Sequence, residues 1–245
     1  METEGDGPPV ILQTGAGGDM QMWRLAGYVS ALRNFRAVLL DHRGHGRSDR
    51  PRERQAHRLS AYVDDVIAVA DALDLQTFSY LGYSDGAVVG YELAAQYGRR
   101  IRAVAGIGAV ETADGWHERR VKLAAEVRIG GTARLVEALG LEEGGPVNWF
   151  ADQMRSTDPE MFALELECWI SGPWSAFPQI DPPALIVVGE LEEGVGHAAE
   201  GHAREAVRLM LRGRYAVLPA LNHITAFARS ESALSHLLPF LRENG

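Results

Sequence analysis

A serine flanked by glycines is the residue in this sequence best suited to covalent chemistry. Residues 82–86 read GYSDG and fit the pattern G-x-S-x-G. The apolar run Phe78–Leu81 precedes the motif and a helical pattern from Ala87 follows it, which is the strand–turn–helix context that the motif requires. A serine at such a tight turn has a strained backbone and points its hydroxyl out at a helix N-terminus. We therefore predict that Ser84 is a nucleophile, with a simple capping serine as the alternative.

One histidine is placed to serve as the base that a weakly nucleophilic serine hydroxyl needs. His223 follows the predicted strand Tyr215–Leu218, where loops converge above a sheet, and it comes after Ser84 in the chain. We predict that His223 is this base, the alternative being a buried loop histidine. The other histidines are assigned to a Gly-rich turn or to solvated loops and helix faces: His42, His45, His57, His117, His197, His202 and His236.

Two backbone N–H groups are predicted to stabilise the oxyanion that forms when a serine attacks a carbonyl carbon. Asp85 directly follows the nucleophile, so its N–H is the first donor. Ala16 follows Gly15 in a glycine-rich loop after the first predicted strand, so its N–H is the second donor. Gly17 in the same loop leaves room for a substrate.

Short apolar runs alternate with amphipathic segments along the chain. The runs are rich in β-branched residues and bounded by Gly, Pro or Asp, which is typical of buried strands: Val10–Thr14, Ala37–Asp41, Phe78–Tyr83, Ile101–Ile107, Ala184–Val188 and Tyr215–Leu218. Helical patterns separate them: Leu59–Leu73, Ala87–Tyr97, His197–Leu211 and Thr225–Leu241. This alternation predicts the α/β class, with a mostly parallel sheet of about six strands flanked by helices.

Residues 111–178 break this rhythm. They contain the helical patterns Trp116–Arg128, Thr132–Leu139 and Asp158–Ile170 but no convincing strand. We therefore predict a helical cap at 111–178, inserted between two parts of one core, 1–110 and 179–245.

Four segments resemble the α/β-hydrolase superfamily, and within it the small esterase, lactonase and cofactor-free haloperoxidase-like serine hydrolases. They are GYSDGA at 82–87, DHRGHGRS at 41–48, LQTGAGG at 12–18 with Trp23 downstream, and LPALNH at 218–223. They match the family's nucleophile elbow, D-x-R-G-x-G-x-S loop, oxyanion loop and catalytic histidine loop. The resemblance covers nearly the whole chain and implies the α/β-hydrolase fold with a Ser-acid-His triad and no cofactor.

The resemblance also points to the acid of that triad. The family pattern after the penultimate strand is G-x-x-D, and residues 189–192 read GELE, so Glu192 takes the position of the acid. A glutamate can do this work, because the carboxylate only orients the imidazole and stabilises its charged form. Glu190 and Glu193 are close alternatives, and Glu111 is a remote one.

The beginning of the chain departs from the family. Only nine residues precede Val10–Thr14, too few for the antiparallel hairpin with which most relatives begin. The family's strand order would leave Arg36–Leu40 at the edge of the sheet, and an exposed apolar edge invites pairing. We predict that the N-terminal segment covers this edge or that the edge pairs in a homodimer.

Composition narrows the range of partners. The 245 residues carry 33 acidic and 24 basic side chains, a formal net charge of −9 that disfavours nucleic acid and anionic membrane surfaces. Cys168 is the single cysteine, no apolar run approaches the length of a membrane span, and no secretory signal is recognisable, so a cytoplasmic location is expected. A metal site is not expected, because HExxH is absent. A dinucleotide site is not expected either, because the pattern G-x-G-x-x-G has Met20 in the place of its third glycine.

These observations together predict a hydrolase that acts on a carboxylic ester or lactone of a small molecule through an acyl-enzyme. Ordinary packing is the alternative for the side chains expected in the substrate site. The substrate-binding candidates are Gly15, Gly17, Trp149, Trp169 and Ile224. Two other functions stay open: a cofactor-free haloperoxidase or perhydrolase on the same triad, and a non-catalytic ligand-binding protein on the same fold.

Overall fold

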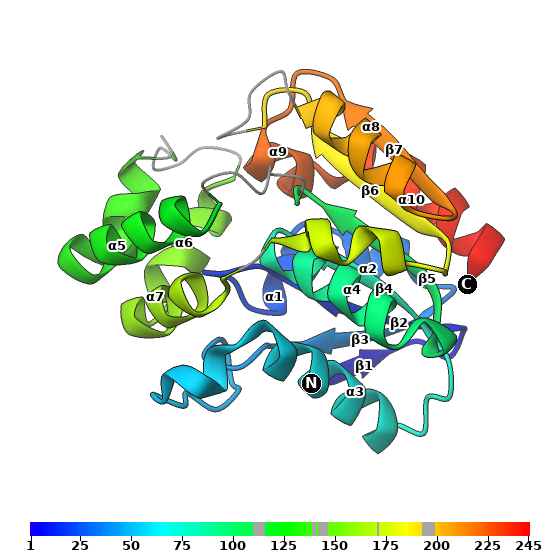
Figure 1. Ribbon diagram of the computed structural model, residues 1–245, viewed down its shortest axis with the longest axis horizontal. Helices are drawn as coiled ribbons and strands as arrows, with labels where there is room; N and C mark the ends of the chain where they lie inside the picture. The colour runs from blue at the N-terminus through cyan, green and yellow to red at the C-terminus, as the bar shows by residue number, and fades with distance from the viewer. Residues whose placement is uncertain (110–115, 139–140, 142–146, 171, 193–198) are drawn as a thin grey trace.

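The computed structural model describes residues 1–109, 116–138, 141, 147–170, 172–192 and 199–245. Within these residues seven strands form one sheet, in the order β1-β3-β2-β4-β5-β6-β7 (Figure 1). All neighbouring strands are parallel except β1 and β3. The strands are β1 (Glu2–Glu4), β2 (Pro9–Gln13), β3 (Arg36–Leu40), β4 (Phe78–Tyr83), β5 (Ile101–Ile107), β6 (Ala184–Gly189) and β7 (Gly213–Leu218). The six predicted strands are thus confirmed, and β1 is added to them.

Helices bury both faces of the sheet, which is why the strands are almost continuously apolar. Successive strand residues point to opposite faces, so Val10 and Leu12 pack into one core while Ile11 packs into the other. Helices α3 (Leu59–Ala72), α4 (Asp85–Gln96) and α8 (Ala199–Leu209) contribute to the core that contains Ile11. Helices α1 (Gln21–Leu25), α2 (Tyr28–Ala31), α9 (His223–Ala228) and α10 (Ser230–Asn244) contribute to the other core.

Strand β1 covers the edge that the sequence left open. It pairs antiparallel with β3 in the register Glu2↔Leu39 and Glu4↔Ala37. It does not form a hairpin with β2, because β3 lies between them. Arg24 fastens β1 through hydrogen bonds to Glu2 (2.6 Å) and Glu4 (2.6 Å). The N-terminal segment therefore covers the edge strand β3. The homodimer stays a prediction, but an exposed β3 edge no longer supports it.

Among the described residues of the predicted cap, three α-helices lie side by side at one end of the sheet (Figure 1). They are α5 (Trp116–Ala138), α6 (Asn148–Ser156) and α7 (Pro159–Cys168). Gly131 interrupts α5 with non-helical angles (φ 69°, ψ 173°), so the two predicted helices meet at this residue. The side chain of Asp158 begins α7 by accepting a hydrogen bond from the N–H of Glu160 (2.9 Å). Helix α6 was not predicted, and the division at 111 and 178 stays a prediction.

One predicted helix is divided. The pattern over 225–241 forms α9 and α10, because Arg229 lies between them with non-helical angles (φ −95°, ψ 68°). Ser230, the first residue of α10, donates a hydrogen bond from its hydroxyl to the carbonyl oxygen of Ala26. The 3₁₀ helices are η1 (Arg54–His57), η2 (Gly98–Arg100), η3 (Pro173–Ser175) and η4 (Phe177–Gln179). None of the helices in the described residues has the length and apolarity needed to cross a bilayer.

Candidate active site

The turn between β4 and α4 holds Ser84 in a strained conformation. Its backbone has φ 55° and ψ −123°, and its N–H donates a hydrogen bond to the carbonyl oxygen of Ile107 (2.8 Å). The flanking glycines are required by close backbone contacts. A Cβ atom would lie 2.3 Å from the carbonyl oxygen of Gly86 if added to Gly82, and 2.2 Å from that of Gln13 if added to Gly86. The motif therefore forms the tight turn that its sequence predicts.

The predicted nucleophile, base and acid meet at this turn. The Nε2 atom of His223 lies 3.0 Å from the Oγ atom of Ser84. On the other side of the ring, Nδ1 is hydrogen-bonded to Oε1 of Glu192, whose side chain is almost fully buried. Oε2 of Glu192 accepts a hydrogen bond from the N–H of Gly189 (3.2 Å). A carboxylate at Nδ1 keeps the proton there and leaves the Nε2 lone pair for the serine hydroxyl.

The other carboxylates considered for this role are placed differently. Oε2 of Glu190 accepts a hydrogen bond from the N–H of Ala220 (2.8 Å), and its side chain is exposed. Glu193 and Glu111 lie outside the described residues.

Asn222 positions the histidine loop as the N-cap of α9, because its side chain accepts a hydrogen bond from the N–H of Thr225 (2.9 Å).

The predicted oxyanion loop passes directly over the serine. A Cβ atom on Gly15 would lie 2.6 Å from Cβ of Ser84 and 2.9 Å from the backbone nitrogen of Asp85. Asp85 is the first residue of α4, where an N–H group has no acceptor within the helix. Ala16 and Asp85 both line the cavity that contains Ser84. The position of these two residues is thus compatible with the predicted donor pair.

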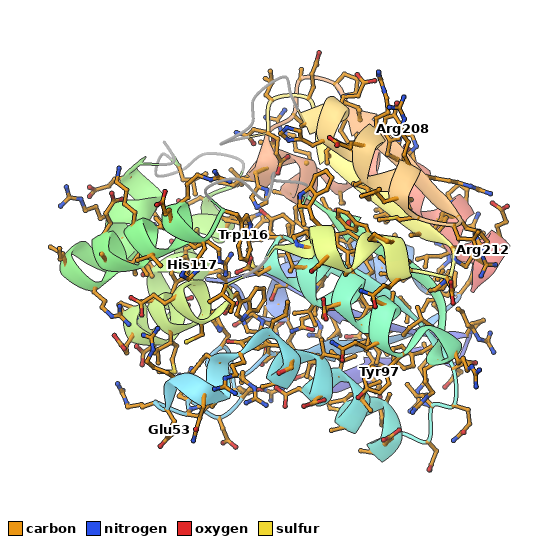
Figure 2. All side chains as sticks on the ribbon, viewed as in Figure 1. Glu53, Tyr97, Trp116, His117, Arg208 and Arg212 are labelled. Carbon is orange, nitrogen blue, oxygen red and sulfur yellow. The ribbon has the colours of Figure 1, made fainter. Side chains whose placement is uncertain are left out.

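A cavity of about 290 Å³ opens beside Ser84 and His223. Its other lining residues come from the core and from all three cap helices, and most are apolar: Ala16, Tyr83, Asp85, Val88, Gly108, Ala109, Trp116, Arg119, Arg120, Leu123, Phe150, Met154, Phe162, Leu166, Pro173 and Ile224. Trp116 is buried between the cap and the core (Figure 2).

The predicted substrate-binding residues divide into two groups. Ile224 lines the cavity, whereas Gly15, Gly17, Trp149 and Trp169 are not part of its lining. Gly15 lies in close contact with Ser84 instead. Trp169 is 1% exposed and packs edge-on against the ring of Tyr62, at 5.1 Å between centroids, so the structure places it in the packing under the cap.

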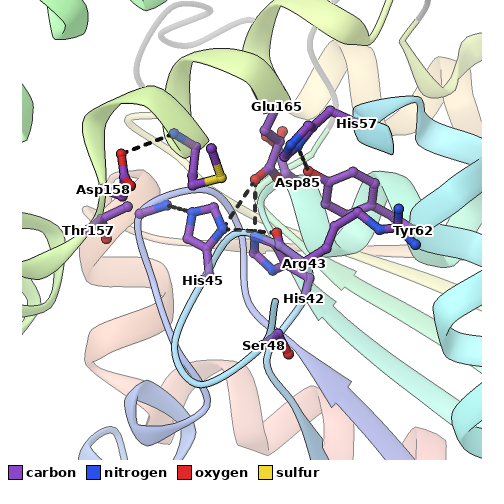
Figure 3. Close-up of polar contacts among 12 residues, drawn as sticks. His42, Arg43, His45, Ser48, His57, Tyr62, Asp85, Thr157, Asp158 and Glu165 are labelled. Carbon is purple, nitrogen blue, oxygen red and sulfur yellow. Dashed lines mark hydrogen bonds and ion pairs between the residues drawn. The ribbon is translucent and has the colours of Figure 1, made fainter. Parts of the chain in front are cut away.

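A cluster of buried polar side chains lies between the D-x-R-G-x-G-x-S loop and the cap (Figure 3). Nε2 of His42 lies 3.0 Å from Oε2 of Glu165, and Nδ1 of His45 lies 3.6 Å from the same atom. Burial lowers the pKa of both histidines to about 4. Burial also raises the pKa of Glu165 to about 8. This cluster was missed at the sequence level, where Glu165 carried no signal.

The aspartate after the nucleophile belongs to the same cluster. Arg120 donates to Oδ1 of Asp85 from Nη1 (2.6 Å) and to Oδ2 from Nη2 (2.8 Å). Burial alone would raise the pKa of Asp85, but the paired guanidinium outweighs it and holds that pKa below its usual value. A charged residue inside a buried turn needs a partner of opposite charge. The need of Asp85 for such a partner was the sequence signal that could have pointed to Arg120.

His57 is fully buried, against the prediction that it is solvated. Its ring forms hydrogen bonds with the hydroxyl of Tyr62 and the carbonyl oxygen of Pro51, which satisfy it in the interior.

His42, His45 and Glu165 are close enough to be considered as metal ligands. Their candidate ligand atoms lie within 4.8 Å of one another. However, Nε2 of His45 accepts a hydrogen bond from the N–H of Gly17 (3.0 Å), which leaves the ring proton on Nδ1 in the neutral form. Since Nδ1 is the atom that faces Glu165, a protonated Nδ1 cannot bind a metal there. The chemistry of this donor set therefore does not fit a metal centre.

Comparisons with known proteins identify the fold. A family model described as alpha/beta hydrolase fold matches residues 8–127. The enol-lactonase from Burkholderia xenovorans LB400 superposes with a TM-score of 0.83 at 26% identity, over 98% of this chain and 95% of that one. The chain adopts the α/β-hydrolase fold. An esterase from Thermogutta terrifontis superposes with a TM-score of 0.82 at 20% identity, over 99% of this chain and 92% of that one, which shows the fold alone.

Curated relatives match this chain over less than half of its length. A non-heme chloroperoxidase of Streptomyces lividans is 35% identical over 101 residues, 40% of this chain and 36% of that one. A protein of Agrobacterium fabrum assigned to the RutD carbamate hydrolases is 32% identical over 112 residues, 46% of this chain and 42% of that one. The chain thus spans less than half the length of these relatives.

Proposed function

We propose that this protein hydrolyses a carboxylic ester or lactone of a small molecule through an acyl-enzyme on Ser84. One observation carries the proposal: Ser84, His223 and Glu192 form a continuous hydrogen-bonded chain whose serine end opens into an apolar cavity. A nucleophile within reach of an oriented base is the signature of covalent catalysis. The likeness to an enol-lactonase, at 26% identity, supports the same class of reaction.

The first half-reaction forms the acyl-enzyme. Nε2 of His223 takes the proton of Ser84 as Oγ bonds to the carbonyl carbon of the substrate. The carbonyl oxygen becomes negatively charged and is stabilised by the N–H groups of Ala16 and Asp85. His223 then passes the proton to the alcohol oxygen as the carbon–oxygen bond breaks. Glu192 stays ionised and stabilises the transient imidazolium.

The second half-reaction releases the acid. A water molecule gives a proton to Nε2 of His223 and bonds through its oxygen to the acyl carbon. The bond to Oγ of Ser84 then breaks, and Oγ recovers the proton from His223. No step requires a cofactor, because acid–base transfer by one imidazole accounts for every proton.

The cavity indicates the kind of acyl or alcohol group that fits. Most of its lining is apolar, with side chains from the cap such as Leu123, Phe150 and Phe162. Its volume of about 290 Å³ suits a small group rather than a long lipid chain. We therefore propose a compact, largely apolar ester or lactone as the substrate class.

Two measurements test this proposal. A fluorophosphonate is expected to label the wild-type protein and not Ser84→Ala, as read by intact mass. Hydrolysis of p-nitrophenyl esters of increasing acyl length is expected to be fastest for short chains and to vanish in Ser84→Ala. A folded wild-type protein that is neither labelled nor active would support the non-catalytic binding protein instead.

The likeness to a chloroperoxidase favours one second activity on the same triad. In this perhydrolase reaction hydrogen peroxide replaces water and releases a peracid from the acyl-enzyme. The peracid would then oxidise a halide ion to hypohalous acid and revert to the carboxylic acid, so halogenation requires peroxide, a halide and a carboxylate such as acetate. Measuring monochlorodimedone halogenation with and without acetate separates this activity from simple hydrolysis.

A further inference from the structure

The residue that supplies one predicted oxyanion donor is tied to the cap through its side chain. Both oxygens of Asp85 accept hydrogen bonds from Arg120 of α5, at 2.6 and 2.8 Å. Both side chains are about nine-tenths buried. A bidentate arginine–carboxylate pair fixes orientation as well as distance. Because Asp85 lines the cavity and begins α4, holding its side chain also restrains the position of its backbone N–H.

The loop that supplies the other predicted donor is tied to the cap as well. The N–H of Gly17, next to Ala16, donates to Nε2 of His45 (3.0 Å). The opposite nitrogen of that ring lies 3.6 Å from Oε2 of Glu165 on α7. Figure 3 shows His45 between this loop and Glu165. Glu165 thus braces the histidine that holds the oxyanion loop.

The two cap residues are also connected to each other. Arg120 donates from Nη2 to the carbonyl oxygen of Glu165 (3.4 Å) and from Nε to that of Leu166 (3.2 Å). Its guanidinium carbon lies 4.5 Å from the ring centroid of Trp116 and 5.0 Å from that of Trp169. Aromatic faces on a desolvated guanidinium restrict its position further. Arg120 is therefore held in one orientation toward Asp85.

We propose that Arg120 and Glu165 are positioning residues through which the cap sets the geometry of the oxyanion hole. The proposal deepens the proposed hydrolase function and rests on it. Arg120 acts through Asp85, and Glu165 acts through His45 and Gly17. A preorganised pair of donors matters because a misplacement of about 1 Å can reduce turnover on the order of 10²-fold.

The protonation state of Glu165 is part of this arrangement. Burial raises the pKa of Glu165 to about 8, so the carboxyl is protonated at neutral pH and can donate a hydrogen bond to the Asp85 carboxylate. Above that pH two carboxylates would lie together in a buried site. The charged and titratable groups that face Glu165 come from five elements or loops: His42 and His45 after β3, His57 in η1, Tyr62 in α3, Asp85 in α4 and Arg120 in α5.

The first experiment separates positioning from folding. Arg120→Met is expected to lower kcat about 10²-fold on a p-nitrophenyl ester, with KM within about 3-fold. Arg120→Met combined with Asp85→Asn removes both buried charges, so thermal stability should recover while kcat stays low. Recovery of kcat together with stability would reduce the pair to a structural role and overturn the proposal.

A matched control lies on the same two helices. Arg128 of α5 also pairs with α7, through Glu160 (2.7 Å) and Glu167, but on the exposed face of the cap. Arg128→Met should leave kcat within about 2-fold of wild type, because surface ion pairs contribute little. A loss equal to that of Arg120→Met would show that any loosening of the cap is enough. A raised KM with unchanged kcat in Arg120→Met would instead make Arg120 a substrate ligand, and either result overturns the proposal.

The second experiment uses pH. In wild type kcat is expected to fall as pH rises through about 8, whereas Glu165→Gln, which keeps a hydrogen-bond donor but cannot ionise, should stay level from pH 7 to 9. The same alkaline fall in both proteins would overturn the role of Glu165. Fluorophosphonate labelling of wild-type Ser84 is the reference for both experiments. If wild type is neither labelled nor active, the proposed function itself fails and this proposal fails with it.

Discussion

The Nε2 atom of His223 lies 3.0 Å from Oγ of Ser84, although 139 residues separate them in the chain. Two residues hold His223 in place, Glu192 and Tyr83. Glu192 hydrogen-bonds Nδ1, the ring of Tyr83 lies 5.1 Å away between centroids, and the hydroxyl of Tyr83 donates to the backbone carbonyl of His223 (3.3 Å). The base is therefore oriented before any substrate is bound, which is what acid–base catalysis requires.

The hydrogen bond of Glu192 to His223 predicts a large and specific effect of one substitution. Glu192→Gln should lower kcat on the order of 10⁴-fold, because an amide cannot stabilise the imidazolium or hold the same tautomer. Glu190→Gln is the matched control, since Glu190 contacts the N–H of Ala220 and not the histidine. Steady-state hydrolysis of one ester by both variants measures the effect. Equal losses in the two would assign the acid elsewhere.

The close contact between Gly15 and Ser84 predicts that an added methyl group blocks the site. Gly15→Ala places a Cβ atom 2.6 Å from Cβ of Ser84 and 2.9 Å from the nitrogen of Asp85. We expect kcat/KM to fall at least about 10²-fold, since one oxyanion donor is displaced. Gly201→Ala in α8 meets no atom within 4 Å and should raise the free energy of unfolding by about 0.5–1 kcal/mol with full activity. A fully active Gly15→Ala protein would place the oxyanion donors elsewhere.

The cavity lining predicts which side chains set acyl length. Leu123→Trp adds bulk inside the cavity, so the preferred p-nitrophenyl ester should shift to a shorter acyl chain. Trp169→Phe changes a residue outside the lining, so the chain-length preference should stay while the free energy of unfolding falls by about 1–3 kcal/mol. A changed preference in Trp169→Phe alone would restore Trp169 as a substrate-binding residue.

The buried histidines predict how stability responds to acid. Burial lowers the pKa of His42 to about 4 in the folded protein, whereas the pKa of an unburied histidine is 6.5. Between these two pH values the unfolded chain therefore binds a proton at His42 that the folded chain does not. Stability from His42 is present above pH 6.5 and is lost as pH falls through about 4. His42→Gln can still donate to Glu165 but does not titrate. Urea unfolding between pH 4 and 7 should therefore show a smaller loss in His42→Gln than in wild type.

An unchanged acid slope in His42→Gln would mean that another group controls acid unfolding. His45 has a pKa lowered to about 4 by the same burial, so it continues to contribute in the variant. The comparison between the two proteins isolates His42, because both retain every other titrating group.

The strands and the catalytic candidates could be predicted because their signals are local. Alternating apolar runs identify buried strands over a few residues, and a tight turn with Ser84 requires glycines at fixed spacing. Glu192 could be placed only through the family resemblance, because residues 189–192 match the family's G-x-x-D pattern with a glutamate in the place of the acid. The division of 225–241 into α9 and α10 was missed, because Ser230 bonds to Ala26 from a distant part of the chain.

The sequence by itself thus determined the six parallel strands, the nucleophile turn and the candidate base, and its family resemblance supplied the candidate acid. Only the tertiary structure decided how buried charges are paired. Asp85 and Arg120 are 35 residues apart, and His42 and Glu165 are 123 apart, so no local periodicity relates them. Their pairing follows from desolvation, which makes an isolated buried charge costly and leaves only the arrangement in which cap and core supply partners to each other.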